Sequence, residues 1–157
     1  MIKIRLIFKL IFCGFLGCIM LPVAGQNRVM KNELVIFTFL SSDGQNICVV
    51  KDSADRYLAV RFARLGKQIL QFPDSLDASS WQKFKYANVS DGEGETQNLS
   101  FIKDGTTYTL YQKKLESGLI DFGLQTGKEG EQKVLHGKLK SKQGTLKYFE
   151  NESKVKK

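Results

Sequence analysis

The chain has 157 residues, enough for one domain, and carries 24 lysines and arginines against 16 aspartates and glutamates, a net charge of +8. It contains a single histidine and three cysteines. A metal site built from several histidines is therefore excluded, and a Ser-His-Asp relay would have to use His136.

The first segment of the chain has the order of a secretory signal peptide. Three basic residues precede or enter an apolar run at residues 10–21, and small residues follow up to Gly25. The apolar run is shorter than the ~20 residues needed to span a bilayer. The sequence therefore predicts cleavage after residues 1–25, with no transmembrane segment afterwards and a mature chain that begins at Gln26.

An alternative reading of the same segment uses Cys18. The sequence Phe15-Leu16-Gly17-Cys18 is similar to a bacterial lipoprotein signal, in which the cysteine is lipidated and becomes the first mature residue. This alternative predicts an outer-membrane lipoprotein, whereas cleavage near Gly25 predicts a periplasmic or secreted protein.

The mature chain has a moderate positive charge. Removal of residues 1–25 leaves 21 basic and 16 acidic residues, a net charge of +5. This surplus favours anionic partners such as acidic glycans, lipopolysaccharide or acidic proteins. An exported protein does not meet nucleic acid in the cytoplasm, so no nucleic-acid partner is expected.

Cysteine usage points to a buried thiol in the mature chain. Cys13 and Cys18 lie in the signal segment, so only Cys48 remains and no intramolecular disulfide can form. Cys48 stands in the apolar stretch Ile47-Cys48-Val49-Val50, and we expect it to act as a small buried hydrophobe.

Short β-type segments separated by turn residues make up the rest of the chain. Asp43-Gly44 and Asp104-Gly105 are pairs that favour tight hairpin turns. We expect strands at residues 33–40, 45–51, 56–64, 68–72, 81–89, 96–103, 106–113, 119–125, 133–139 and 145–149. For residues 56–64 a helix is the alternative, because the apolar residues in 54–65 also have helical spacing and Ser53 could cap a helix that starts there.

This spacing predicts an all-β fold that is mainly antiparallel, a small β-sandwich or β-barrel of about 8–10 short strands. Residues 26–150 are expected to form a single β-rich domain. Residues 151–157 are charged, and we expect them to form a flexible tail. The oligomeric state stays open.

No constellation of catalytic residues is visible, and no cofactor or metal is expected. His136 has no partner near it in the sequence, and the carboxylates of Asp91, Glu93 and Glu95 fall in a glycine-rich loop that favours solvated side chains. The alternative for that loop is a calcium site, because alternating acidic residues with glycine can surround a hard cation.

With no catalytic, cofactor or metal site expected, we expect the domain to act by binding a ligand or partner at its surface. If residues 81–89 form a strand, Trp81, Lys83 and Lys85 stand on one face and could meet an acidic sugar or an anionic protein. The alternative is that Trp81 belongs to the core, as a tryptophan in a small domain usually does.

A second candidate binding segment is Asp104-Gly105-Thr106-Thr107-Tyr108. It resembles a variant of the Ser-Gly-x-x-Tyr loop of periplasmic lysozyme inhibitors, with Asp104 in place of the serine, and Thr126-Gly127-Lys128 is similar to their second motif. The resemblance implies a small exported β-barrel in which Asp104, Gly105 and Tyr108 enter the cleft of a lysozyme.

These observations predict an exported, non-enzymatic binding protein that recognises a protein or an anionic envelope component. A lysozyme inhibitor is its most specific form. The alternative is a structural or lipid-anchored envelope protein, which the Cys18 signal would favour.

Overall fold

The computed structural model describes residues 29–92, 94–128 and 130–157. The predicted signal peptide, Cys18 and Glu93 lie outside the described residues. Within the described part of the chain, no helix is long and apolar enough to cross a membrane.

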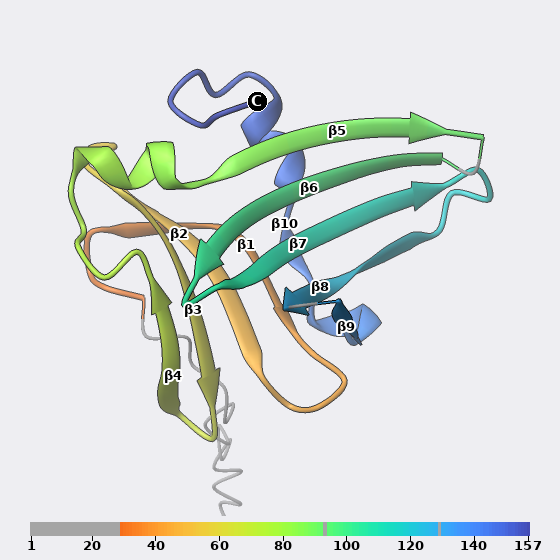
Figure 1. Cartoon of the computed structure of the whole chain (residues 1–157), viewed down its shortest axis with the longest axis horizontal. Coiled ribbons are helices and arrows are strands. Elements are labelled where there is room, and N and C mark those ends of the chain that lie inside the picture. The colour runs from red at the N-terminus through yellow and green to blue at the C-terminus, as the bar shows by residue number, and fades with distance from the viewer. Residues whose placement is uncertain (1–28, 93, 129) are drawn as a thin grey trace, which may run out of the picture.

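Two five-stranded antiparallel sheets form the fold, which confirms the predicted all-β class (Figure 1). In the described part of the chain, three short 3-10 helices accompany them, η1 (Ala78–Lys83), η2 (Leu139–Ser141) and η3 (Leu146–Glu150). The first sheet has the order β10 (Gln143–Gly144), β1 (Glu33–Leu40), β2 (Asn46–Asp52), β3 (Leu58–Arg64) and β4 (Lys67–Phe72). The second has the order β5 (Lys85–Asp91), β6 (Gly94–Lys103), β7 (Thr106–Leu115), β8 (Ile120–Lys128) and β9 (Glu131–His136).

The inner faces of the sheets share one hydrophobic core. Phe39 on β1 meets Phe122 on β8 with ring centroids 5.5 Å apart, and Phe62 on β3 meets Tyr108 on β7 at 5.8 Å. Helix η3 adds Leu146 and Phe149, both fully buried. Burial of these aromatic and aliphatic side chains from both sheets is the main force that holds the sheets together.

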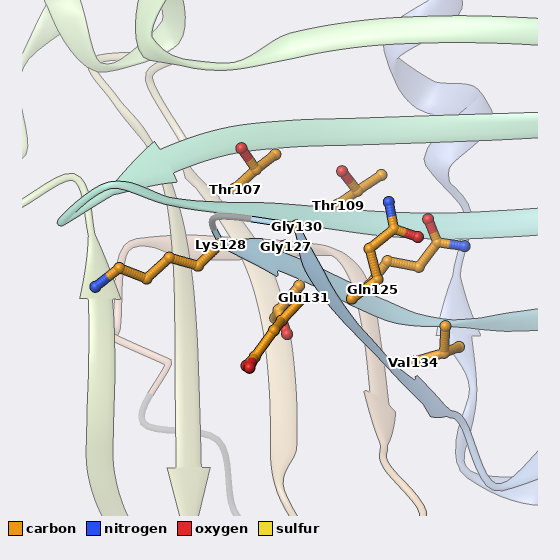
Figure 2. Close-up of a pocket in the computed structure, with 10 residues that line it drawn as sticks. Thr107, Thr109, Gln125, Gly127, Lys128, Gly130, Glu131 and Val134 are labelled. Atoms are coloured by element: carbon orange, nitrogen blue, oxygen red, sulfur yellow. The ribbon is translucent and has the colours of Figure 1, made fainter.

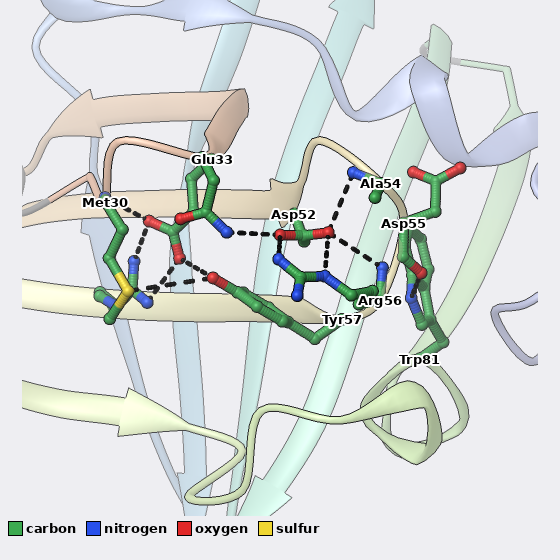
Figure 3. A network of polar contacts seen from close by, with 10 residues as sticks. Met30, Glu33, Asp52, Ala54, Asp55, Arg56, Tyr57 and Trp81 are labelled. Carbon is green, nitrogen blue, oxygen red and sulfur yellow. Dashed lines mark hydrogen bonds and ion pairs between the residues drawn. The ribbon is translucent and has the colours of Figure 1, made fainter.

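The outer face of the first sheet is also covered, and it carries a buried ion pair (Figure 3). Cys48, Val50 and Ala59 are buried there beneath Val29 and Leu76. This confirms the predicted burial of Cys48.

The ion pair on this face joins β1 to β3. Arg61 donates two hydrogen bonds to Glu33, at 2.6 and 2.7 Å, and Tyr57 donates a third at 2.9 Å. Burial opposes ionisation of Glu33, but the hydrogen bonds from Arg61, the Met30 amide and Tyr57 outweigh it, so the pKa of Glu33 is lowered. The carboxylate is thus held ionised by donors that face it.

Residues 56–64 form a strand and not a helix, which settles the alternative that the sequence left open. The reason is that both faces of β3 are buried: Leu58, Val60 and Phe62 point into the core between the sheets, and Ala59 lies under the outer cover. A helix could not satisfy both layers at once.

Two other expected strands were wrong in part. Residues 145–149 consist of the N-cap Thr145 and most of the 3-10 helix η3, and the Thr145 side chain accepts a hydrogen bond from the Lys147 amide at 3.2 Å. Residues 78–83 form η1, capped by the Asp77 carboxylate, so β5 starts only at Lys85. In both segments a side-chain cap at the first turn competes with the extended backbone that the apolar spacing favoured.

The prediction of a flexible tail also differs from the structure. Val155 is only 3% exposed and belongs to the hydrophobic core. The Tyr86 amide donates a hydrogen bond to the Lys156 carbonyl at 2.7 Å, and the Lys156 amide donates to the Phe84 carbonyl at 3.3 Å. One buried valine and these two backbone bonds dock the charged segment against the start of β5.

The two sheets are hydrogen-bonded to each other near one pair of edges and not at the other pair. Beyond β1 the backbone is joined to the end of β9 by a bridge between Ser41 and Gly137 and by a hydrogen bond from the Lys138 amide to the Leu40 carbonyl at 2.8 Å. The opposite edges are β4 of the first sheet and β5 of the second, which are not paired with each other.

Candidate binding site

A hollow of about 630 Å³ lies at the β5 side of the second sheet, where η1, β5, β6 and the start of β7 meet the last residue of β4. It is lined by Phe72 on β4, Phe84 before β5, Phe101 on β6 and Lys156, the last residue but one of the sequence. Ligand pockets in proteins have volumes of about 300–1,000 Å³, so the space is large enough for a small molecule or an acyl chain.

Aromatic rings form the floor of this hollow. Phe72 stacks on Phe101 with ring centroids 4.5 Å apart, and Phe84 meets both rings edge-on at 5.3 and 5.7 Å. Tyr108 stacks on Phe101 at 5.0 Å and so extends the layer toward Phe62. At the rim, Ile102 is 65% exposed. The floor is therefore apolar, and Phe84 and Phe101 are almost completely buried in it, so the exposed apolar surface of the hollow comes mainly from Phe72 and Ile102.

Three lysines stand around the hollow: Lys83, Lys85 and Lys156. All three are exposed. Among the described residues, Lys85 and Lys156 form no ion pair with a carboxylate. Their ammonium groups are therefore available to an external anion next to an apolar surface.

The docked tail brings two of these lysines together. Lys85 and Lys156 form an isolated parallel bridge, so their backbones run side by side. Successive residues of an extended chain point to opposite sides, which lets Val155 enter the core while Lys156 lines the hollow.

Trp81 does not share an exposed face with Lys83 and Lys85, so that prediction is wrong. Its side chain is only 2% exposed, its indole Nε1 donates to the Asp55 carbonyl at 3.1 Å, and the Lys154 ammonium lies 4.8 Å from the ring centroid. The alternative of a core tryptophan is the correct one. Figure 3 shows Trp81 beside Asp55. The buried indole anchors η1, and Lys83 at the end of η1 lines the hollow.

Asp104 and Gly105 form the two-residue turn between β6 and β7, as their sequence predicts. Both have positive φ, 50° and 72°, the combination required by a type I′ hairpin. Tyr108 is half-buried in the aromatic layer and does not stand at the tip of the loop. Strand pairing places it opposite Thr126, so the two segments that resemble lysozyme-inhibitor motifs lie side by side.

The structure gives His136 partners that the sequence did not reveal. On the outer face of the second sheet, the Tyr111 hydroxyl lies 3.0 Å from His136 Nδ1, and the Asp121 carboxylate lies 3.3 Å from each of them. Burial and the neighbouring Asp121 carboxylate raise the pKa of Tyr111, so its phenol stays protonated. The sequence carries one signal for this cluster, because Tyr111 and His136 fall at outward-facing positions of the strands β7 and β9.

Asp91 and Glu95, the described acidic residues of the loop, each interact with a neighbouring side chain. Asp91 lies 3.8 Å from Lys113, and Glu95 accepts a hydrogen bond from Asn88 at 2.8 Å. In the part of the chain that the structure describes, no three histidine, cysteine or acidic residues come together in a way that could hold a metal ion.

Comparison with known proteins adds no relative: no protein-family model, no curated protein sequence and no solved structure matches this chain.

Proposed function

We propose that this protein is an exported, non-enzymatic binding domain, and that its ligand is an amphiphilic anion held in the hollow between β4 and β5. The ligand has an acyl chain that lies against Phe72 and Ile102, beside the buried rings of Phe84 and Phe101, and a carboxylate or phosphate group beside the lysines. The observation that carries the proposal is that the apolar side chains line the same hollow as Lys85 and Lys156, two cations without a carboxylate partner among the described residues.

The two parts of the hollow contribute differently to binding. Each buried methylene group of an acyl chain contributes about 0.8 kcal/mol, so the aromatic floor supplies most of the affinity. An exposed charge pair contributes only about 0.2–1 kcal/mol. The lysines therefore select an anionic head group and make the affinity depend on salt, while the chain decides whether the ligand binds at all.

We also infer that the two sheets act as the walls of a barrel that is open on one side. The Ser41–Gly137 bridge joins the walls at the β1 edge, and the hollow lies at the opposite, unpaired edge. An opening in the wall of a small β-barrel gives an apolar ligand access to the interior without unfolding the domain.

Fluorescence titration with a polyene fatty acid tests the proposal. We expect saturable binding by the chain without residues 1–25, with the affinity falling severalfold in the double variant Lys85→Glu/Lys156→Glu and losing most of its salt dependence. Lys67→Glu/Lys140→Glu is the matched control, because both lysines are exposed at other places on the molecule. Equal loss in both double variants would reduce the effect to net charge, and absence of saturable binding would refute the proposal.

Ile102→Glu separates the floor from the lysines. It places a charge at the rim of the hollow on a side chain that is 65% exposed, so folding should be unaffected while acyl-chain binding falls. Circular dichroism verifies the fold of each variant.

Two parts of the sequence-based hypothesis have separate tests. Mass determination of the protein from the cell envelope distinguishes a chain that begins at Gln26 from one that begins at a lipidated Cys18. The adjacency of Tyr108 and Thr126 favours lysozyme as a second candidate partner, and an assay of lysozyme-catalysed cell lysis in the presence of the protein tests it.

A further inference from the structure

The outer face of the second sheet carries two adjoining hollows of about 360 and 440 Å³. Gln125 and Val134 line both, so the two spaces form one continuous surface, named here the outer groove. Thr107 and Thr109 stand at one end beside the turn between β8 and β9 (Figure 2). Tyr111 and His136 stand at the other end.

Strand register explains why these side chains form one surface. The pairs Ser100–Thr109, Thr109–Gln125 and Gln125–Val134 form a row across strands β6 to β9. The neighbouring outward-facing row passes through Asn98, Tyr111, Gly123 and His136. Side chains in adjacent rows on one face of a sheet lie close enough to contact one ligand together.

Gly123 shapes the second row. A Cβ atom at this position would lie 2.3 Å from the Leu135 carbonyl oxygen and 2.9 Å from Tyr111 Cε1. The Tyr111 ring occupies the space over Gly123 and reaches across β8 to His136. His136 is the residue on β9 that pairs with Gly123. The absence of a side chain at residue 123 therefore leaves room for the Tyr111 ring, whose hydroxyl lies 3.0 Å from His136 Nδ1.

The chemistry of the outer groove differs from that of the hollow between the sheets. Its floor consists mainly of hydroxyl and amide groups, each of which can donate and accept hydrogen bonds. Its charged members balance, since Lys113 and Lys128 stand against Asp121 and Glu131. Val134, which is 45% exposed, gives a small apolar contact in the centre.

This combination fits a neutral polyhydroxylated chain. Sugar hydroxyls are donors and acceptors that match threonine, asparagine and glutamine, and the C–H face of a sugar ring suits an exposed aliphatic side chain. The Asp121 carboxylate can accept from a hydroxyl, and such charge-assisted bonds are about twice as strong as neutral ones. A strongly anionic or cationic ligand would find no excess of opposite charge here.

We propose that the outer groove binds a neutral oligosaccharide, which runs across strands β7 to β9 from Thr107 to His136. This site adjoins the hollow that we assign to an amphiphilic anion, because Thr107 lines both, but it extends away from that hollow over β8 and β9 and gives the domain a second ligand. Gln125 hydrogen-bonds the sugar at the centre, Val134 contacts a ring face, and the Tyr111–His136–Asp121 cluster binds the sugar at the end.

The test is an NMR titration of the ¹⁵N-labelled protein without residues 1–25, using neutral tetrasaccharides of glucose and of N-acetylglucosamine as probes. We expect saturable shifts in the amides of β7, β8 and β9, with affinities in the millimolar to micromolar range. Since a net hydrogen bond contributes about 0.5–1.5 kcal/mol, Gln125→Ala should weaken binding about 2- to 10-fold. Val134→Asp should abolish it.

Gln68→Ala is the matched control, because Gln68 is an exposed glutamine on β4 of the other sheet. Its affinity for the tetrasaccharide should equal that of the wild type. The proposal is overturned if neither neutral tetrasaccharide gives saturable shifts, if Gln125→Ala and Gln68→Ala bind alike, or if a sulfated tetrasaccharide binds more tightly than both. None of these results depends on the fatty-acid site, because Lys85→Glu/Lys156→Glu should leave sugar binding unchanged.

Discussion

Lys156 pairs with Lys85 as an isolated parallel bridge, and the residue between this bridge and the rest of the tail, Val155, is buried in the core. The segment that follows η3 is thus part of the fold and part of the candidate site. Its docking joins two cations that are distant in the sequence at the rim of one hollow.

Val155→Ala should destabilise the protein. Removal of two buried methyl groups costs about 1–3 kcal/mol in the free energy of unfolding. Urea denaturation measures this value, and Val89→Ala is the control because Val89 is 49% exposed. We also expect weaker fatty-acid binding in Val155→Ala, since a released tail removes Lys156 from the hollow. Equal stability of the two variants would mean that the tail contributes nothing to the fold.

Arg61→Ala should be among the most damaging substitutions of a charged residue. It leaves the Glu33 carboxylate, whose side chain is fully buried, without its main partner. Breaking one side of a buried ion pair typically costs about 3–5 kcal/mol, whereas an exposed pair contributes about 0–1 kcal/mol. Arg64→Ala is the control, because the Arg64–Asp43 pair is partly exposed. Similar unfolding free energies for the two variants would contradict the account of the buried pair.

Acid should weaken the protein partly through Glu33. Its pKa is lowered from its ordinary value of 4.5, because the donated hydrogen bonds outweigh the effect of burial. A lowered pKa contributes stability above the ordinary value, and this contribution is lost as the pH falls through the folded-state pKa. The loss in unfolding free energy between neutral pH and the acidic range below the ordinary pKa should therefore be smaller in Glu33→Gln than in the wild type. An identical loss in both would show that Glu33 is not among the groups that cause acid destabilisation.

Cys48 should react slowly with thiol reagents in the native protein. Its side chain is buried, and desolvation raises its pKa to about 11. The reactive thiolate is therefore scarce at mildly alkaline pH, and the sulfur is also inaccessible. Labelling with a chromogenic disulfide should become fast only after denaturant is added. Rapid labelling without denaturant would place Cys48 at the surface.

Local sequence patterns predicted a large part of the fold. Alternating apolar residues located β1 to β4 and β6 to β8 within a few residues, and Asp104-Gly105 predicted a hairpin turn whose positive φ angles the structure has. These features depend on neighbours in the sequence. The burial of Cys48 was also predictable, because its neighbours on both sides are apolar.

Features that depend on contacts between distant segments could not be predicted in the same way. Trp81 follows an alternating pattern with Lys83, but the Asp77 cap starts a 3-10 helix and turns the indole into the core. The hollow needs Phe72 stacked on Phe101 and Lys156 beside Lys85, and no local pattern pairs these residues. Of the predicted site residues, Lys83 and Lys85 line the hollow, Tyr108 supports its floor, and Asp104 and Gly105 form only the adjacent turn.

The most direct measurement of the central claim is NMR mapping of dodecyl phosphate on the ¹⁵N,¹³C-labelled protein without residues 1–25, below the concentration at which the detergent forms micelles. The account predicts saturable shifts at the Ile102 methyl groups and at the amides of Phe84 and Phe101, and dodecanol, which has the same chain without the charge, should bind more weakly. Gln125 and Val134 in the outer groove should not shift. Shifts spread over the whole surface, or saturable shifts confined to residues away from the hollow, would contradict it.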